Sequence, residues 1–245
     1  MNRGKLKQIL LITDGCSNHG EDPAAMAALA SEQGITVNVI GIADEKAVDE
    51  DAMREIESIA ASGGGVSQTV YTKSLSQTVQ MVTRKAMTQT IQGVVNKELQ
   101  QILGKKVSME ELPPDKRGEV LEVVDELGET MQLELVILVD ASASMTPKLP
   151  TVKEALLDLS ISLNSRIGEN EFSVCVFPGK RADAEMVIDW TPRLGSISSM
   201  FSKLSAGGLT PTGPAIREGA ALFSKKKKSR RDMLDDEEYR YEGGR

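Results

Sequence analysis

Five oxygen-bearing side chains have the types and the spacing to hold a hard metal ion. Asp140, Ser142 and Ser144 alternate directly after an apolar run, and Asp14 ends a second apolar run near the N-terminus. Thr210 lies in a loop rich in glycine and proline, just before a helical stretch. Two carboxylates and three hydroxyls suit Mg²⁺, with Mn²⁺ or Ca²⁺ as alternatives, and disfavour zinc and copper, which prefer imidazole or thiolate.

The elements that must position these side chains follow the pattern of an α/β protein, in which short apolar runs alternate with amphipathic helical stretches. Strands are predicted at residues 8–13, 35–42, 66–71, 133–139, 171–177 and 186–190, and helices at 22–33, 49–61, 153–163, 197–204 and 213–223. Open parallel sheets bind ligands at the carboxyl ends of their strands. Asp14 and Asp140 are therefore expected at one edge of a sheet.

Two further segments lie outside this pattern. Residues 86–131 carry an apolar stripe at helical spacing and are predicted to form a helical connector, as a structural strap rather than a partner-binding coiled coil. Residues 225–245 are highly charged and have no apolar period, which predicts a disordered tail.

Three segments resemble the motifs of the metal-ion-dependent adhesion site (MIDAS) of von Willebrand factor A (vWA) domains. They are residues 136–145, with Asp-Ala-Ser-Ala-Ser, residues 208–213, with Leu-Thr-Pro-Thr, and residues 10–15, with Thr-Asp-Gly. The resemblance covers residues 5–85 and 133–224, and the chain looks most like small vWA proteins of spore-forming bacilli. In that family the Asp-x-Ser-x-Ser motif comes first, so the order here is that of a circular permutation.

The resemblance implies a three-layer, doubly wound, Rossmann-like fold with a mainly parallel sheet. Residues 1–224 would form one permuted domain, in which 1–85 supply the C-terminal half of the family fold and 132–224 the N-terminal half. By motif match, the implied metal ligands are Asp14, Asp140, Ser142, Ser144 and Thr210.

The function that the resemblance implies is divalent-cation-dependent protein binding without catalysis. A Mg²⁺ ion in the MIDAS would grip an acidic side chain of a protein partner. One alternative is a substrate adaptor or regulatory partner of an AAA+ ATPase, contacted through the connector or the tail. A metal-dependent hydrolase is a weaker alternative, because the sequence offers no evident general base or second metal site.

The composition indicates which kinds of partner the protein binds and in which compartment it is found. A net charge of −7 and a pI near 5.0 predict binding neither to nucleic acid nor to anionic membranes. The chain has no signal-peptide pattern or long apolar run, and its two cysteines do not form a disulfide framework, which favours the cytoplasm. Cys16 and His19 lie close to Asp14, but we interpret them as an inert thiol and a solvated imidazole.

The two halves are expected to share one sheet. As separate domains, each would leave an apolar strand, at residues 8–13 or 133–139, on an exposed edge that favours aggregation. Joined in the family's order, these strands become central neighbours. A monomer paired within one chain is favoured, with a domain-swapped dimer as the alternative.

Overall fold

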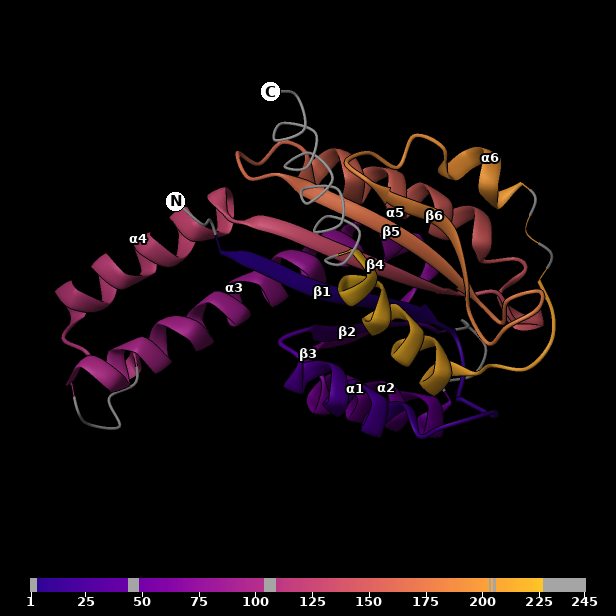
Figure 1. The fold of residues 1–245 in the computed structure, drawn as a ribbon, viewed down its shortest axis with the longest axis horizontal. Coiled ribbons are helices and arrows are strands. Elements are labelled where there is room, and N and C mark those ends of the chain that lie inside the picture. The colour runs from indigo at the N-terminus through magenta and orange to yellow at the C-terminus, as the bar shows by residue number, and fades with distance from the viewer. Residues whose placement is uncertain (1–3, 44–48, 104–108, 203, 205, 227–245) are drawn as a thin grey trace, which may run out of the picture.

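The computed structural model describes residues 4–43, 49–103, 109–202, 204 and 206–226. They contain a six-stranded sheet in the order β3-β2-β1-β4-β5-β6 (Figure 1). The strands are β1 (Lys5–Thr13), β2 (Thr36–Ala43), β3 (Gly64–Tyr71), β4 (Gln132–Asp140), β5 (Asn170–Phe177) and β6 (Glu185–Thr191). All pairs are parallel except β5 and β6, which run antiparallel at one edge.

The strand order is that of a permuted doubly wound sheet. If counting starts at β4 instead of β1, the order read from β6 becomes 3-2-1-4-5-6, the common order of doubly wound sheets. The central strands β1 and β4 come from distant parts of the sequence, yet they pair over eight residues, from Lys5 with Gln132 to Ile12 with Val139. The predicted α/β fold class and the central pairing are therefore confirmed.

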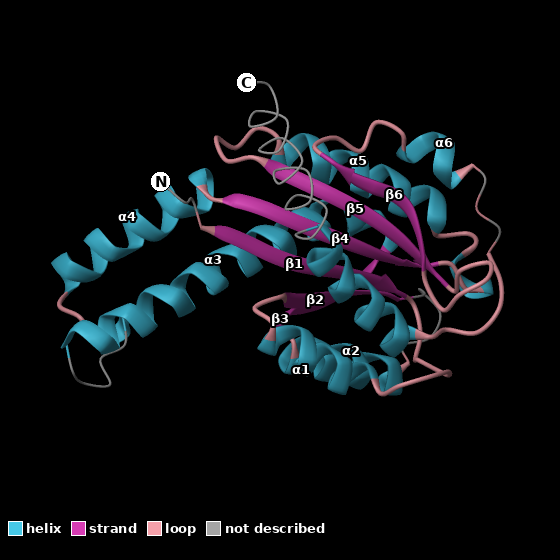
Figure 2. Cartoon of the chain, viewed as in Figure 1, coloured by secondary structure: helices cyan, strands magenta, loops and turns pink. Residues whose placement is uncertain are grey.

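Helices cover both faces of the sheet, as Figure 2 shows. The α-helices are α1 (Pro23–Glu32), α2 (Glu50–Ser62), α3 (Leu75–Leu103), α4 (Pro114–Thr130), α5 (Leu149–Leu163), α6 (Ile197–Phe201) and a helix at residues 212–226. Single turns of 3-10 helix occupy Thr72–Ser74, Met109–Glu111 and Ala143–Met145. Among the described helices, none has the length and apolar content needed to cross a membrane.

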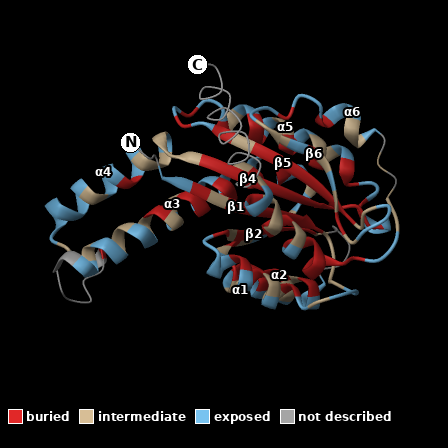
Figure 3. Ribbon diagram, in the orientation of Figure 1, coloured by how far each residue is buried: buried red, intermediate tan, exposed pale blue. Residues whose placement is uncertain are grey.

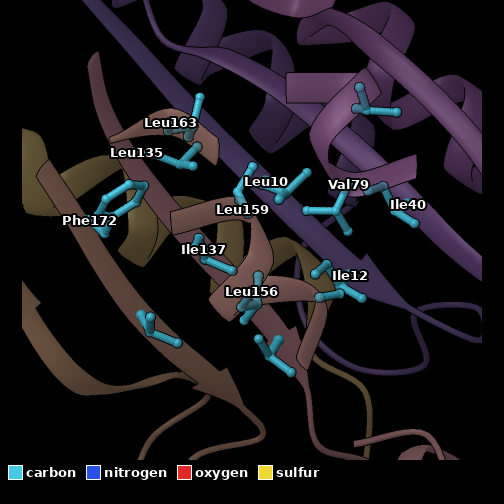
Figure 4. Close-up of a cluster of buried hydrophobic side chains, with 14 of the residues drawn as sticks. Leu10, Ile12, Ile40, Val79, Leu135, Ile137, Leu156, Leu159, Leu163 and Phe172 are labelled. Carbon is cyan, nitrogen blue, oxygen red and sulfur yellow. The ribbon is translucent and has the colours of Figure 1, made fainter. Parts of the chain in front are cut away.

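The alternation of side chains along each strand divides the core into two layers. Leu10 and Ile12 of β1 pack with α3 and α5 on one face, where Leu156 of α5 lies among them (Figure 4). Ile9 and Leu11 point to the other face and pack with α1, α2 and the helix at 212–226. Figure 3 shows that most residues of the central strands are buried. Because both faces are covered, the central stretches of these strands, residues 9–12 and 135–139, are continuously apolar.

Helices α3 and α4 extend together beyond the sheet as a two-helix arm (Figure 1). Helix α3 begins inside the fold and passes residue 86 without a break. The base of the arm is held by Arg166, whose guanidinium donates to the carbonyl oxygens of Gly128 and Met131, each at 2.8 Å. Residues 104–108 of the predicted connector lie outside the described residues.

The last helix continues beyond its predicted end at residue 223, and beyond the predicted start of the tail at 225. Lys226 is still helical, and its Nζ lies 3.1 Å from Glu134 Oε1 and 2.5 Å from Glu171 Oε2. Lys5 Nζ reaches the same Glu134 oxygen at 3.1 Å. The two ends of the described fold therefore meet at one carboxylate, as a circular permutation requires. Residues 227–245 of the predicted tail lie outside the described residues.

We expect Glu134→Gln to lower the free energy of unfolding at pH 7 by about 2 kcal/mol, because charged hydrogen bonds to Lys226 and Lys5 are lost. Burial raises the pKa of Glu134, but these two lysines outweigh it, and the pKa lies below its ordinary value. The stabilisation is therefore present above the unfolded-state pKa, about 4.3, and is lost as the pH falls through the folded pKa.

Urea unfolding at several pH values measures this effect. Glu119→Gln is the matched control, because the Glu119 ion pair with Lys116 is exposed on α4 and should contribute less than about 0.5 kcal/mol. Equal effects of the two substitutions would contradict the prediction.

Candidate metal site

Four of the five predicted metal-site residues form one hydrogen-bonded cluster at the carboxyl edge of the central strands. The Ser144 hydroxyl donates to Asp14 Oδ1 at 2.8 Å and lies 3.1 Å from the Ser142 hydroxyl. The Ser142 backbone N–H donates to Asp140 Oδ1 at 2.7 Å. Asp14 follows β1 and Asp140 ends β4, so the cluster lies where the two sequence halves meet.

Local geometry at the end of β4 explains this arrangement. The chain turns after Asp140, and the bond from the Ser142 N–H to the Asp140 carboxylate closes the turn. Thr13, the last residue of β1, donates its hydroxyl to Asp140 Oδ2 at 2.7 Å. Sequence reasoning missed this role of Thr13, although it lies inside the Thr-Asp-Gly motif.

The cluster runs from a buried floor to an exposed opening. Asp140 is completely buried, and burial raises its pKa; the hydrogen bonds from Thr13 and Ser142 oppose this rise, and the nearby charge of Asp14 adds to it. Ser142 is also buried, whereas Ser144 is exposed. A ligand arriving from solvent would therefore meet the cluster at Ser144.

A buried lysine completes the cluster. Lys148 Nζ lies 2.6 Å from Asp14 Oδ2, and the side chains of Lys148 and Asp14 are only 6% and 2% exposed. Sequence reasoning missed Lys148, because a lysine in a turn beside proline normally reads as a solvated residue.

Thr210 joins the site through its backbone. Its carbonyl accepts from Asn18 N and from the Ser17 hydroxyl, each at 3.2 Å, and its N–H donates to Asn18 Oδ1 at 2.7 Å. Within the described part of the chain, no hydrogen bond links the Thr210 hydroxyl to the other four predicted residues. The nearby Thr212 hydroxyl is buried, and it has no hydrogen-bond partner among the described residues. Hydrogen bonds thus connect the Thr210 loop to the loop after Asp14, but they do not include the Thr210 hydroxyl in the cluster.

The other reactive groups near Asp14 are poor candidates for catalysis. Burial raises the pKa of Cys16, and the charges of Glu55, Asp49 and Asp51 raise it further, so its thiolate is disfavoured. His19 is exposed. Glu55 instead has a structural role, since its carboxylate accepts from the Ser17 N–H at 2.7 Å and holds the loop after Asp14.

The donor chemistry of the cluster fits a hard cation. Among the residues that the structure describes, no group of three or more His, Cys, Asp or Glu side chains converges to hold a metal ion, so a site here would depend on two carboxylates and on hydroxyl oxygens. The cluster combines two carboxylates with hydroxyls, and Mg²⁺ is commonly bound by one or two carboxylates while it keeps several waters.

An open cleft of about 410 Å³ lies beside this edge of the sheet. Ala141, the residue after Asp140, lines it together with Pro178, Met186 of β6 and Met200 of α6. A ligand bound at the cluster would therefore have an adjacent, partly apolar surface for its neighbouring groups.

We expect Gly213→Ala to lower the free energy of unfolding by roughly 1–3 kcal/mol, because a Cβ at this position would overlap the backbone carbonyl of Glu21. The overlap would push the start of the last helix away from the loop that follows Asp14. Gly15→Ala is the matched control, because a Cβ there meets no atom within 4 Å. Thermal denaturation of both variants tests this packing, and a stable Gly213→Ala protein would contradict it.

The matches to known protein families are consistent with the reversed order of the motifs. Two models described as von Willebrand factor type A domain match the chain, one at residues 1–85 and the other at residues 135–234. The Bacillus subtilis (strain 168) "Uncharacterized protein YabS" is 69% identical over 242 residues, covering 99% of this chain and 98% of that protein.

A solved structure is also similar over nearly the whole chain. The crystal structure of an uncharacterized protein from Alicyclobacillus acidocaldarius subsp. acidocaldarius DSM 446 has 43% sequence identity and a TM-score of 0.84. The similarity covers 92% of this chain and 96% of the other. Most of the fold is therefore similar to an architecture already seen in a crystal.

Proposed function

Because the chain belongs to the von Willebrand factor type A family, as a circularly permuted member of the YabS type, we propose that it is a divalent-cation-dependent protein-binding module. Domains of this family typically bind a divalent metal at a MIDAS. The observation that carries the proposal is the cluster of Asp14, Asp140, Ser142 and Ser144, which unites motifs more than a hundred residues apart.

The residues of the cluster have separate roles in this proposal. Asp140, Ser142, Ser144 and Asp14 hold Mg²⁺, and Thr210 is expected to add a ligand from its loop. The bound cation supplies an exchangeable coordination position for an anionic oxygen. The Thr13 hydroxyl and the Ser142 N–H orient Asp140 and favour its charged form.

The partner is expected to present an acidic side chain. The exposure of Ser144 leaves the cluster open on one side, and the cleft beside Ala141 offers room for the residues around that side chain. We expect binding rather than turnover, because the sequence offers no evident general base or second metal site.

Affinity capture tests the proposal. The immobilised chain is exposed to lysate of its source organism in Mg²⁺ and then eluted with EDTA, and the Asp140→Asn protein serves as the control bait. A specific protein should be retained only by the wild-type chain in Mg²⁺. Retention of the same protein in EDTA, or by the Asp140→Asn bait, would refute cation-dependent binding.

A further inference from the structure

The ion pair between Lys148 and Asp14 lies inside the candidate metal site. Both side chains are almost inaccessible to solvent, and their charged atoms are 2.6 Å apart. Lysine is seldom buried to this degree unless it is paired. The segment 142–148, which carries the Ser142 and Ser144 hydroxyls, thus also carries the buried ammonium of Lys148.

The backbone fixes the position of Lys148. Its N–H donates to the Met145 carbonyl at 2.8 Å, and its own carbonyl accepts from Val152 N at 3.0 Å in the first turn of α5. The 3-10 turn Ala143–Met145 links it to Ser144. The backbone of Lys148 therefore follows directly from the turn that carries the Ser144 hydroxyl, and the ion pair with Asp14 positions its ammonium.

The two oxygens of Asp14 have different partners. Oδ2 accepts from Lys148, whereas Oδ1 accepts from the Ser144 hydroxyl. Only Oδ1 faces the hydroxyl cluster in which a cation would be bound. Lys148 thereby determines which oxygen of Asp14 is available as a ligand.

The ammonium also changes the charge of the site. Asp14, Asp140 and Lys148 together carry one net negative charge, so a bound divalent cation would leave one net positive charge. Without the lysine, the same cation and the two carboxylates would be neutral. In a buried site, where charges are poorly screened, this difference decides how strongly an anionic group is attracted.

We propose that Lys148 sets the charge of the metal site, weakening cation binding and strengthening the grip of the loaded site on a carboxylate. This inference rests on the proposed function and adds the reason why an acidic partner is preferred. A purely structural lysine would behave differently, because its loss would weaken cation binding and carboxylate binding together.

Three variants separate these roles. Lys148→Gln can still donate an N–H to Asp14 but carries no charge, and Lys148→Arg keeps the charge. Lys153→Gln is the matched control, because Lys153 is a half-buried lysine on the same helix α5. If the glutamine variant does not fold, Lys148→Met is the second neutral variant, since its apolar side chain fills much of the lysine's volume.

Two affinities are measured for each folded protein. Calorimetry gives the affinity for Mg²⁺, and an NMR titration at saturating Mg²⁺ gives the affinity for an acetylated and amidated Gly-Asp-Gly peptide. We expect the neutral variants to bind Mg²⁺ roughly tenfold more tightly and the peptide roughly tenfold more weakly. Lys148→Arg and Lys153→Gln should stay within about threefold of the wild type in both.

A parallel loss of both affinities in the neutral variants, or no change in either, would overturn the role of Lys148. The wild-type titration tests the proposed function separately. A wild-type protein that does not bind Mg²⁺ would refute the metal site itself, whereas normal wild-type binding with parallel losses in the variants would refute only the charge-setting role.

Discussion

Separation of the chain between Leu112 and Pro113 is expected to abolish cation binding by both fragments, and mixing the fragments is expected to restore it. The first fragment contains Asp14, and the second contains Asp140 with the serine and threonine motifs. The central strands β1 and β4 pair across this division over eight residues. Each fragment alone would expose one of these apolar strands and lack part of the cluster.

Mn²⁺ binding, followed by electron paramagnetic resonance, measures this effect on each fragment and on the mixture. The control is a circular permutant. It has the same cut between Leu112 and Pro113, but a short flexible linker joins residue 226 to residue 4. Because Lys5 and Lys226 both reach Glu134, the linker spans a short gap and restores the family's motif order. This permutant should bind Mn²⁺ within about threefold of the intact chain. Tight binding by either isolated fragment would refute a single site shared by the two halves.

Asp140→Asn is expected to weaken Mg²⁺ binding by roughly a hundredfold while the fold is retained, because a unit charge next to the cation is removed. The amide oxygen can still accept from the Ser142 N–H, and the amide nitrogen can donate to the Thr13 hydroxyl. Burial already disfavours the Asp140 carboxylate, as its raised pKa indicates. Stability in EDTA should therefore stay within about 1 kcal/mol of the wild type.

Thermal denaturation with and without Mg²⁺ checks both parts of this prediction. Mg²⁺ should raise the Tm of the wild type, since a ligand that binds only the folded state stabilises it, and it should leave the Tm of Asp140→Asn nearly unchanged. Asp158→Asn neutralises an exposed carboxylate on α5 as a control and should keep the Mg²⁺ response. An equal Mg²⁺ response of Asp140→Asn and the wild type would show that Asp140 is not a ligand.

Sequence periodicity predicted most of the fold. The stretches at residues 9–12 and 135–139 are continuously apolar because both faces of the central strands are covered, and this pattern is visible without coordinates. Element boundaries were less predictable. The last helix was expected to end at 223, because Lys225 and Lys226 read as part of a solvated charge run. Lys226 is instead held by Glu134, a residue 92 positions away.

The sequence by itself determined the fold class, the reversed motif order and the hard-oxygen character of the candidate ligands, because these depend on residue type and local spacing. Only the tertiary structure decided which of those groups meet. It joined Asp14 to Ser144, left the Thr210 hydroxyl outside the hydrogen-bonded cluster, and placed the Lys148 ammonium against Asp14. Burial and pairing between distant segments arise only when the two central strands come together, and local sequence carries no signal for them.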